Sequence, residues 1–110
     1  GEVTVAQTGY YNISWCISTR MSTLTSTGLR FTTKCWLQRF HVSQWTTVPG
    51  TTAFTYNRQH QNGEGTMNQS CILYLQQGNR ISVQAARHAG GTGGTLYSMA
   101  DACSLSIFLM

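Results

Sequence analysis

The clearest pattern in the chain is a run of alternating residues close to its N-terminus. From Tyr10 to Thr19, large apolar side chains alternate with smaller or polar ones. Successive side chains of a β-strand point to opposite faces, so this alternation predicts a strand with one buried face. The buried face would carry Tyr11, Ile13, Trp15 and Ile17, and the opposite face Tyr10, Asn12, Ser14, Cys16 and Ser18.

Other stretches, which alternate or are rich in Thr and aromatic residues, also predict strands. They are Glu2–Ala6, Arg30–Val42, Trp45–Val48, Thr51–Tyr56, Ser70–Gln76, Arg80–Ala86 and Ser104–Met110. Loops are expected over Asn57–Gly65 and His88–Gly94, and Met21–Gly28 is expected to be a loop or a weak edge strand. The short segment Leu96–Cys103 is the one helical candidate. Short strands joined by turns, with no helix between them, predict an antiparallel β-sandwich or barrel. Residues 1–110 are expected to form one domain.

The composition narrows the chemistry. Charged residues make up 9% of the 110 residues, against roughly 25% in an average soluble domain. Only Glu2, Glu64 and Asp101 are acidic, which argues against hydrolysis by paired carboxylates and against an oxygen-ligated cation site. The net charge of +4 comes from scattered residues, so a nucleic-acid partner is not expected. No apolar run approaches about 18 residues, so no membrane insertion is expected. A targeting segment is expected to be absent or already removed.

Four cysteines, Cys16, Cys35, Cys71 and Cys103, have no zinc-type spacing. They allow three full disulfide pairings, and buried free thiols are an equal alternative. Strand parity places Cys71 and Cys103 on inward faces and Cys16 on an outward face. Cys71–Cys103 is therefore the bridge that parity allows.

Three segments, taken together, resemble the C1q/TNF-like jelly-roll family. The first is an alternating strand opened by a glycine and aromatics, residues 9–17 (GYYNISWCI). The second is a hairpin of two alternating strands, residues 73–83 (LYLQQGNRISV). The third is the closing strand, residues 104–109 (SLSIFL). Asn79 stands in place of the Asp of the family's Gly-Asp turn. By this resemblance the sequence is expected to start near the family's third or fourth strand, without the opening strands. The closing strand is therefore expected to have a bare edge, unless another segment covers it.

The resemblance implies a non-enzymatic trimeric head, secreted or displayed on a surface, that needs no cofactor. In the family, three subunits pack around a three-fold axis. The strand face opposite the buried one would then point toward that axis. Exposed apolar residues on this face are typical of a subunit interface. The interface residues would be Asn12, Ser14, Ile72, Tyr74, Ser104, Ser106 and Phe108. The alternative is that Ile72 and Tyr74 pack under a loop of their own chain.

The ligand of such a head would be a protein receptor or a cell-surface glycan. Loops carry recognition on rigid β scaffolds, and two polar, basic loops are expected here. They are Asn57–Gly65, which holds Arg58 and His60, and Arg87–Gly94, which holds Arg87 and His88. With so few acidic residues available inside the chain, Arg58 and Arg87 would be free to meet an anionic partner such as a sialylated or sulfated glycan.

Two further hypotheses for the whole chain stay open. The same fold and a polar, charge-poor composition are typical of the C-terminal tip of a viral, phage or bacterial trimeric fibre. The second hypothesis is a small lectin-like sugar binder, in which Trp36, Trp45 and Tyr56 would stack on sugar rings. Core packing is nevertheless expected for two of these three residues.

Other candidate chemistry is weaker. His41, His60 and His88 lack the short spacing of metal ligands, and His88 with Asp101 and a serine shows no nucleophile elbow. The glycine-rich segment at residues 88–94 lacks the residues of a phosphate-binding loop. Of the two glycosylation sequons, at Asn12 and Asn68, Asn68 is expected to be the usable one because it precedes a strand.

Overall fold

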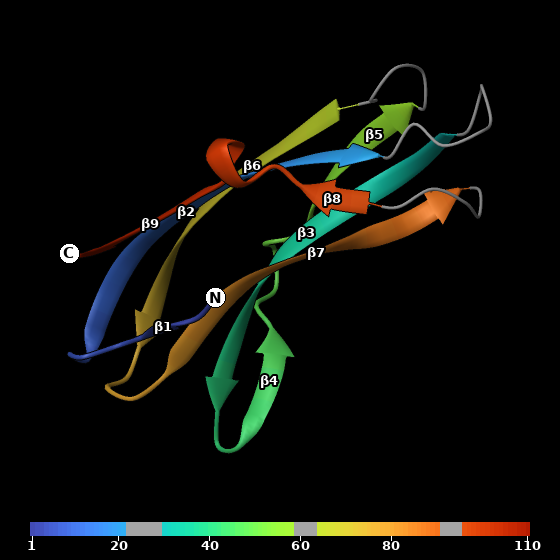
Figure 1. The fold of residues 1–110 in the computed structure, drawn as a ribbon. Coiled ribbons are helices and arrows are strands. Elements are labelled where there is room, and N and C mark those ends of the chain that lie inside the picture. The colour runs from blue at the N-terminus through green and yellow to red at the C-terminus, as the bar shows by residue number, and fades with distance from the viewer. Residues whose placement is uncertain (22–29, 59–63, 91–95) are drawn as a thin grey trace.

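The computed structural model describes residues 1–21, 30–58, 64–90 and 96–110. In these ranges the chain forms two antiparallel sheets packed face to face (Figure 1). The strands are β1 (Val3–Thr4), β2 (Gly9–Met21), β3 (Arg30–His41), β4 (Gln44–Thr47), β5 (Ala53–Arg58), β6 (Glu64–Leu75), β7 (Arg80–Gly90), β8 (Leu96–Ser98) and β9 (Ser104–Leu109), with a 3₁₀ turn η1 (Ala100–Ala102). The predicted antiparallel β-sandwich is confirmed.

Each sheet is built around one long strand. In sheet A, β3 pairs with β7 on one edge, while β4 and β5 share its other edge at opposite ends; β1 extends the sheet beyond β7. In sheet B, β2 pairs with β6 on one edge and with β9 and β8 on the other. Gly9↔Leu75 and Tyr11↔Leu109 set the register of the two long pairings of β2.

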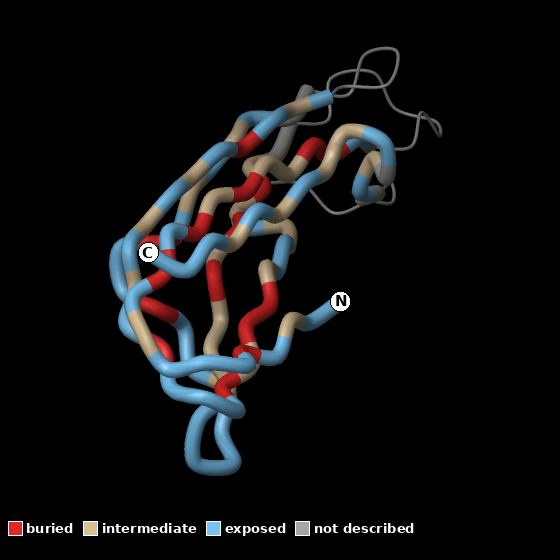
Figure 2. Tube along the Cα trace, turned by 90° about the vertical axis from the view of Figure 1, so that its left-hand side faces the viewer, coloured by how far each residue is buried: buried red, intermediate tan, exposed pale blue. Residues whose placement is uncertain are grey.

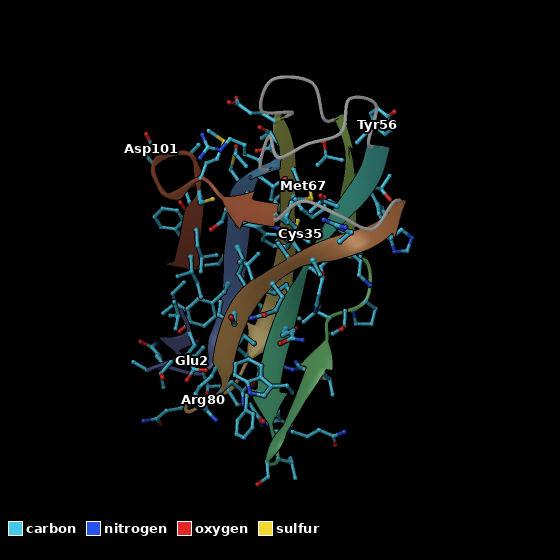
Figure 3. The ribbon with its side chains drawn as sticks, turned by 45° about the vertical axis from the view of Figure 1, so that its right-hand side comes forward. Glu2, Cys35, Tyr56, Met67, Arg80 and Asp101 are labelled. Carbon is cyan, nitrogen blue, oxygen red and sulfur yellow. The ribbon has the colours of Figure 1, made fainter. Side chains whose placement is uncertain are left out.

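The core lies between the two sheets, as the buried segments in Figure 2 show. Tyr11, Ile13 and Trp15 are buried and Ile17 packs against them, so the predicted inward face of β2 is confirmed. Sheet A contributes Cys35, Leu37 and Ile81, each fully buried. Figure 3 shows Cys35 and Met67 in this interior. Each such apolar side chain stabilises the fold by about 1.5–3 kcal/mol.

Three predicted elements differ most from the structure. β6 begins at Glu64, not Ser70, and β7 continues to Gly90 through residues expected to be a loop. The pairing of β7 with β3 accommodates this extension by a bulge, because Thr32 pairs with Ala89 and Thr33 with Arg87. The helical candidate forms β8 and a single 3₁₀ turn instead, because three of its residues pair with β2.

The β3–β4 hairpin has a strained turn. His41 pairs with Gln44, and the two residues between them, Val42 and Ser43, have φ of 51° and 59°. A two-residue turn with both φ values positive is normally Asn-Gly, because a β-branched residue clashes with its own backbone there. Val42 is 81% exposed, so its side chain contributes little packing in return.

Replacing Val42 by Asn and Ser43 by Gly is expected to raise the free energy of unfolding by about 1–2 kcal/mol. Urea unfolding of the double variant measures this. Gly78→Ala is the control and is expected to lower the free energy of unfolding. The φ angle at Gly78 is 89° and a Cβ there meets nothing within 4 Å. Any loss of stability therefore comes from the backbone conformation alone. An unchanged urea midpoint in the double variant would contradict the strain.

Candidate functional surface

The outer face of sheet B carries an exposed apolar patch. Its members are Tyr10, Ile72, Tyr74, Phe108 and Met110, which are between 45% and 70% exposed. They come from three neighbouring strands in register, since Asn12 pairs with both Ile72 and Phe108 while Tyr10 pairs with Tyr74. The rings of Tyr10 and Tyr74 stack with their centroids 5.2 Å apart. We call these five residues the apolar patch.

Small polar residues continue this face beyond the apolar patch. Ser14 lies between Ser70 and Ser106, and Cys16 lies between Asn68 and Ser104. The seven predicted interface residues therefore share one face of sheet B, namely Asn12, Ser14, Ile72, Tyr74, Ser104, Ser106 and Phe108. Tyr10 and Met110 complete the apolar patch and were not predicted for it, although strand parity places both with Asn12 and Phe108.

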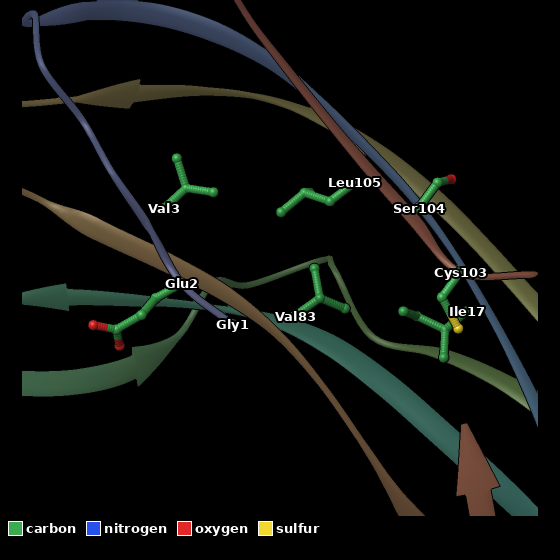
Figure 4. A pocket seen from close by; sticks show the side chains of 8 residues that line it. All are labelled: Gly1, Glu2, Val3, Ile17, Val83, Cys103, Ser104 and Leu105. Atoms are coloured by element: carbon green, nitrogen blue, oxygen red, sulfur yellow. The ribbon is translucent and has the colours of Figure 1, made fainter. Parts of the chain in front are cut away.

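The edge of sheet B at β9 is open. Within the described residues β9 pairs with β2 alone, so the expected bare edge is present. On one side of the sandwich β5 lies against β6. On the other, an apolar groove of about 340 Å³ separates β1 and β7 from β9 (Figure 4). Val3 and Val83 line it from sheet A, and Ile17 and Leu105 line it from sheet B.

Three of the four predicted ligand residues lie in strands and not in loops. Arg58 is the last residue of β5 and pairs with Arg30; Arg87 lies in β7 and pairs with Thr33. The two arginines are thus at the same end of sheet A, on either side of β3. The rings of His88 and Phe54 pack edge to face, with centroids 4.9 Å apart. His60 lies outside the described residues. Their role in binding stays a prediction.

The alternative chemistries find little support in the described ranges. His41 and His88 lie at opposite ends of sheet A, and no group of three metal-ligating side chains occurs among the described residues. Asp101 lies in η1, which contacts β2 in sheet B (Figure 3), whereas His88 packs on β5 of sheet A. The described chain has no helix of the length and apolarity that a membrane span requires.

The aromatic residues considered for sugar stacking are not in the core, so the expectation for two of them is wrong. Trp36 is half-buried with the Lys34 ammonium 5.0 Å from its ring centroid, and Trp45 stacks on Phe40 at 5.3 Å. Tyr56 is 53% exposed near one end of sheet A (Figure 3). All three stand on strands of sheet A, but they do not converge on one site.

Asn68 lies within β6, not before a strand as predicted, and its partner in β2 is Cys16. Both sequon asparagines are exposed on the outer face of sheet B. A glycan on either one would occupy the same face as the apolar patch.

All four cysteines are free thiols. The Cys71–Cys103 bridge that parity allows does not form, because Cys71 is paired with Ile13 across one edge of β2 while Cys103 precedes β9 on the other edge. That separation exceeds the roughly 7 Å between Cα atoms that a disulfide can span. Burial is the main cause that raises the pKa of the Cys35 thiol and of the Cys71 thiol.

The raised pKa of Cys35 predicts a loss of stability in alkali. The folded state keeps the thiol proton that the unfolded chain releases near the ordinary pKa of 9.0. The free energy of unfolding is therefore at its full value below pH 9 and falls as the pH rises above it. Urea unfolding between pH 8 and pH 10 measures the slope, and Cys35→Ala is expected to reduce it. An equally steep fall in Cys35→Ala would contradict this assignment.

Comparison with known proteins decides the fold. No protein-family model matches the sequence, and no curated protein matches it. Solved structures do match. The Eiger TNF of S. frugiperda superposes with a TM-score of 0.72 at 17% identity, over 100% of this chain. Murine APRIL gives 0.66 at 16% identity over 99%, and the globular domain of zebrafish complement 1qA gives 0.62 at 18% over 100%.

The chain has the C1q/TNF-like jelly-roll fold. The resemblance found in the three sequence segments is thereby confirmed at the level of the fold. The C1q/TNF-like chain spans only part of these structures, covering 64% of the Eiger chain, 70% of the APRIL chain and 69% of the complement chain.

Proposed function

We propose that residues 1–110 form one head domain that assembles as a homotrimer and binds a protein receptor or a cell-surface glycan outside the cell, without catalysis. The apolar patch carries this proposal. Soluble monomers rarely expose several large apolar side chains together, and such patches mark interaction surfaces. The C1q/TNF-like fold supports three as the number of copies, since three subunits around one axis is the arrangement that the resemblance implies.

The chemistry of the outer face of sheet B suits a subunit interface. Its aromatic end holds Tyr10, Tyr74 and Phe108, and aromatic residues are enriched in the cores of interfaces. Ser14, Ser70 and Ser106 lie side by side in the next part of the face, where short side chains permit a close approach of neighbouring sheets. No Lys, Arg, Asp or Glu occurs among these residues, so no charge would be buried on assembly.

Light scattering on the purified protein tests the assembly. The expected mass is about three times the 12.2 kDa of one chain. A mass of one chain at high protein concentration would contradict the trimer. Binding of the same protein to cultured cells, measured by flow cytometry, tests the recognition role separately.

A further inference from the structure

A second pocket lies at the end of the sandwich where β3 meets the β6–β7 turn. It has a volume of about 310 Å³, at the lower limit of the roughly 300–1,000 Å³ typical of small-molecule sites. Its lining residues are Arg39, His41, Tyr74, Gln76 and Asn79. None of them is aliphatic and none is acidic. The pocket therefore offers hydrogen-bond donors, one fixed positive charge and one aromatic ring.

Arg39 is a charged residue at an inward position. On β3 it follows the buried residues Cys35 and Leu37 at two-residue intervals. Its Nε atom is buried and has no hydrogen-bond partner, and within the described residues no carboxylate pairs with its guanidinium. A buried, unpaired donor on a charged group is costly and rare in folded proteins. Arg39 also lines the pocket, so an anion bound there would pair with the rest of its guanidinium and offset the unpaired charge.

A hydrogen-bond chain orients His41 as a second donor. The backbone N–H of Gln76 donates to Oδ1 of Asn79 at 3.0 Å, so the other end of that amide is its NH₂ group. Nδ2 of Asn79 then donates to Nδ1 of His41 at 3.0 Å. Because Nδ1 accepts, the proton of the neutral ring is on Nε2. Asn79 is only 7% exposed, which holds this arrangement in place.

We propose that this pocket binds a carboxylated monosaccharide. The Arg39 guanidinium pairs with the carboxylate, an arrangement that its planar fork suits. The Gln76 amide and the His41 Nε2–H, which line the same pocket, donate to ring oxygens. A polar lining fits a polyhydroxylated ligand better than an apolar one. The inference rests on the proposed recognition role and names the ligand class for it.

Isothermal titration with N-acetylneuraminic acid, glucuronic acid, glucose and acetate tests the proposal. Both acidic sugars are expected to bind with a Kd near 1 mM. Glucose lacks the carboxylate and acetate lacks the ring, so each is expected to bind at least about tenfold more weakly. Equal binding of glucose would overturn the role of Arg39, and equal binding of acetate would overturn sugar recognition.

Two sets of variants locate the site. Arg39→Gln removes the positive charge and is expected to weaken binding by about tenfold or more. Lys34→Gln, also on β3 but stacked on Trp36, removes the same charge away from the pocket and should leave binding unchanged. Gln76→Glu places a carboxylate in the pocket and should abolish binding. Gln77→Glu is its matched control, since Gln77 is an exposed neighbour that does not line the pocket.

Melting temperatures separate lost binding from lost folding. Gln76 and Gln77 are both exposed, so their variants are expected to fold even if Arg39→Gln does not. The titration is also run on Phe108→Asp, which alters the apolar patch without touching the pocket. Binding in both the wild type and this variant supports a site formed within one chain, whatever the oligomeric mass. If neither the wild type nor Phe108→Asp binds the acidic sugars, the proposed site is overturned, and the trimer is unaffected by that result. If only the wild type binds them, the assignment of the site to a single chain is overturned.

Discussion

The Phe108→Asp variant is expected to have the mass of a single chain, against about three chains for the wild type. Phe108 is 66% exposed and stands in register with Asn12 and Ile72 across three strands. In a trimer around this face, the new carboxylate would be desolvated and close to its two symmetry copies. Burial of unpaired like charges costs several kcal/mol for each ion, more than a modest interface supplies.

Tyr56→Asp is the matched control for this prediction. Tyr56 is 53% exposed on β5 of sheet A. Its substitution also replaces an exposed aromatic side chain by a carboxylate, but outside the apolar patch. Both substitutions are at exposed positions, and the melting temperature of an isolated subunit should change little. A trimer that persists in Phe108→Asp, or that is lost equally in Tyr56→Asp, would contradict the assignment of the interface.

The Thr51→Val variant is expected to lose about 2–4 kcal/mol of unfolding free energy. Thr51 is fully buried between β4 and β5. Its Oγ1 accepts a hydrogen bond from the backbone N of Leu37 at 3.1 Å and donates one to the carbonyl of Val48 at 2.6 Å. Valine keeps the shape but leaves both backbone groups without this partner in the interior, and each such group costs about 1–3 kcal/mol.

Thr52→Val provides the control for Thr51→Val, because the neighbouring threonine is exposed and its replacement should change stability by no more than about 0.5 kcal/mol. Thr51→Ser keeps the hydroxyl and should recover most of the lost stability. Chemical unfolding of the three variants decides the matter. Equal stability of Thr51→Val and Thr52→Val would show that the buried hydroxyl is dispensable.

The sequence predicted the fold best where burial is one-sided. β2 alternates cleanly because one face contacts the core and the other faces outward, so Ile13 and Trp15 could be assigned from their spacing alone. The first half of β6 could not be assigned in this way. Met67 is its one buried residue before Ser70, and a single apolar position sets no period.

The ends of β7 and β8 follow from tertiary pairing. Residues 88–90 have weak strand propensity, yet β3 holds Ala89 and Gly90 in register beyond a bulge. Pairing with β2 likewise overrides the helical tendency of Leu96–Ser98. Local propensity is a weak prior beside such long-range hydrogen bonding.

The pocket could not be predicted because its residues come from β3, the end of β6 and the turn that follows. One signal was nonetheless present in the sequence. Arg39 continues the inward parity of Cys35 and Leu37, and a charged residue at an inward position is unusual enough to mark a site. The two hydrogen bonds of the Thr51 hydroxyl could not be predicted from the sequence, because Thr is common throughout this chain.

The place of β2 at the centre of sheet B determines the order in which the chain can fold. Strands β3, β4, β5 and β7 lie between residues 30 and 90, so sheet A can begin to pair while the chain is still being made. Sheet B cannot close so early, because Tyr11 pairs with Leu109 at the other end of the chain. Pairing of such distant segments is slow and leaves apolar strands exposed while it is incomplete. Loss of the six residues of β9 would therefore leave Ile13 and Trp15 without their last partner strand, and would act as a folding defect more than as a change at the surface.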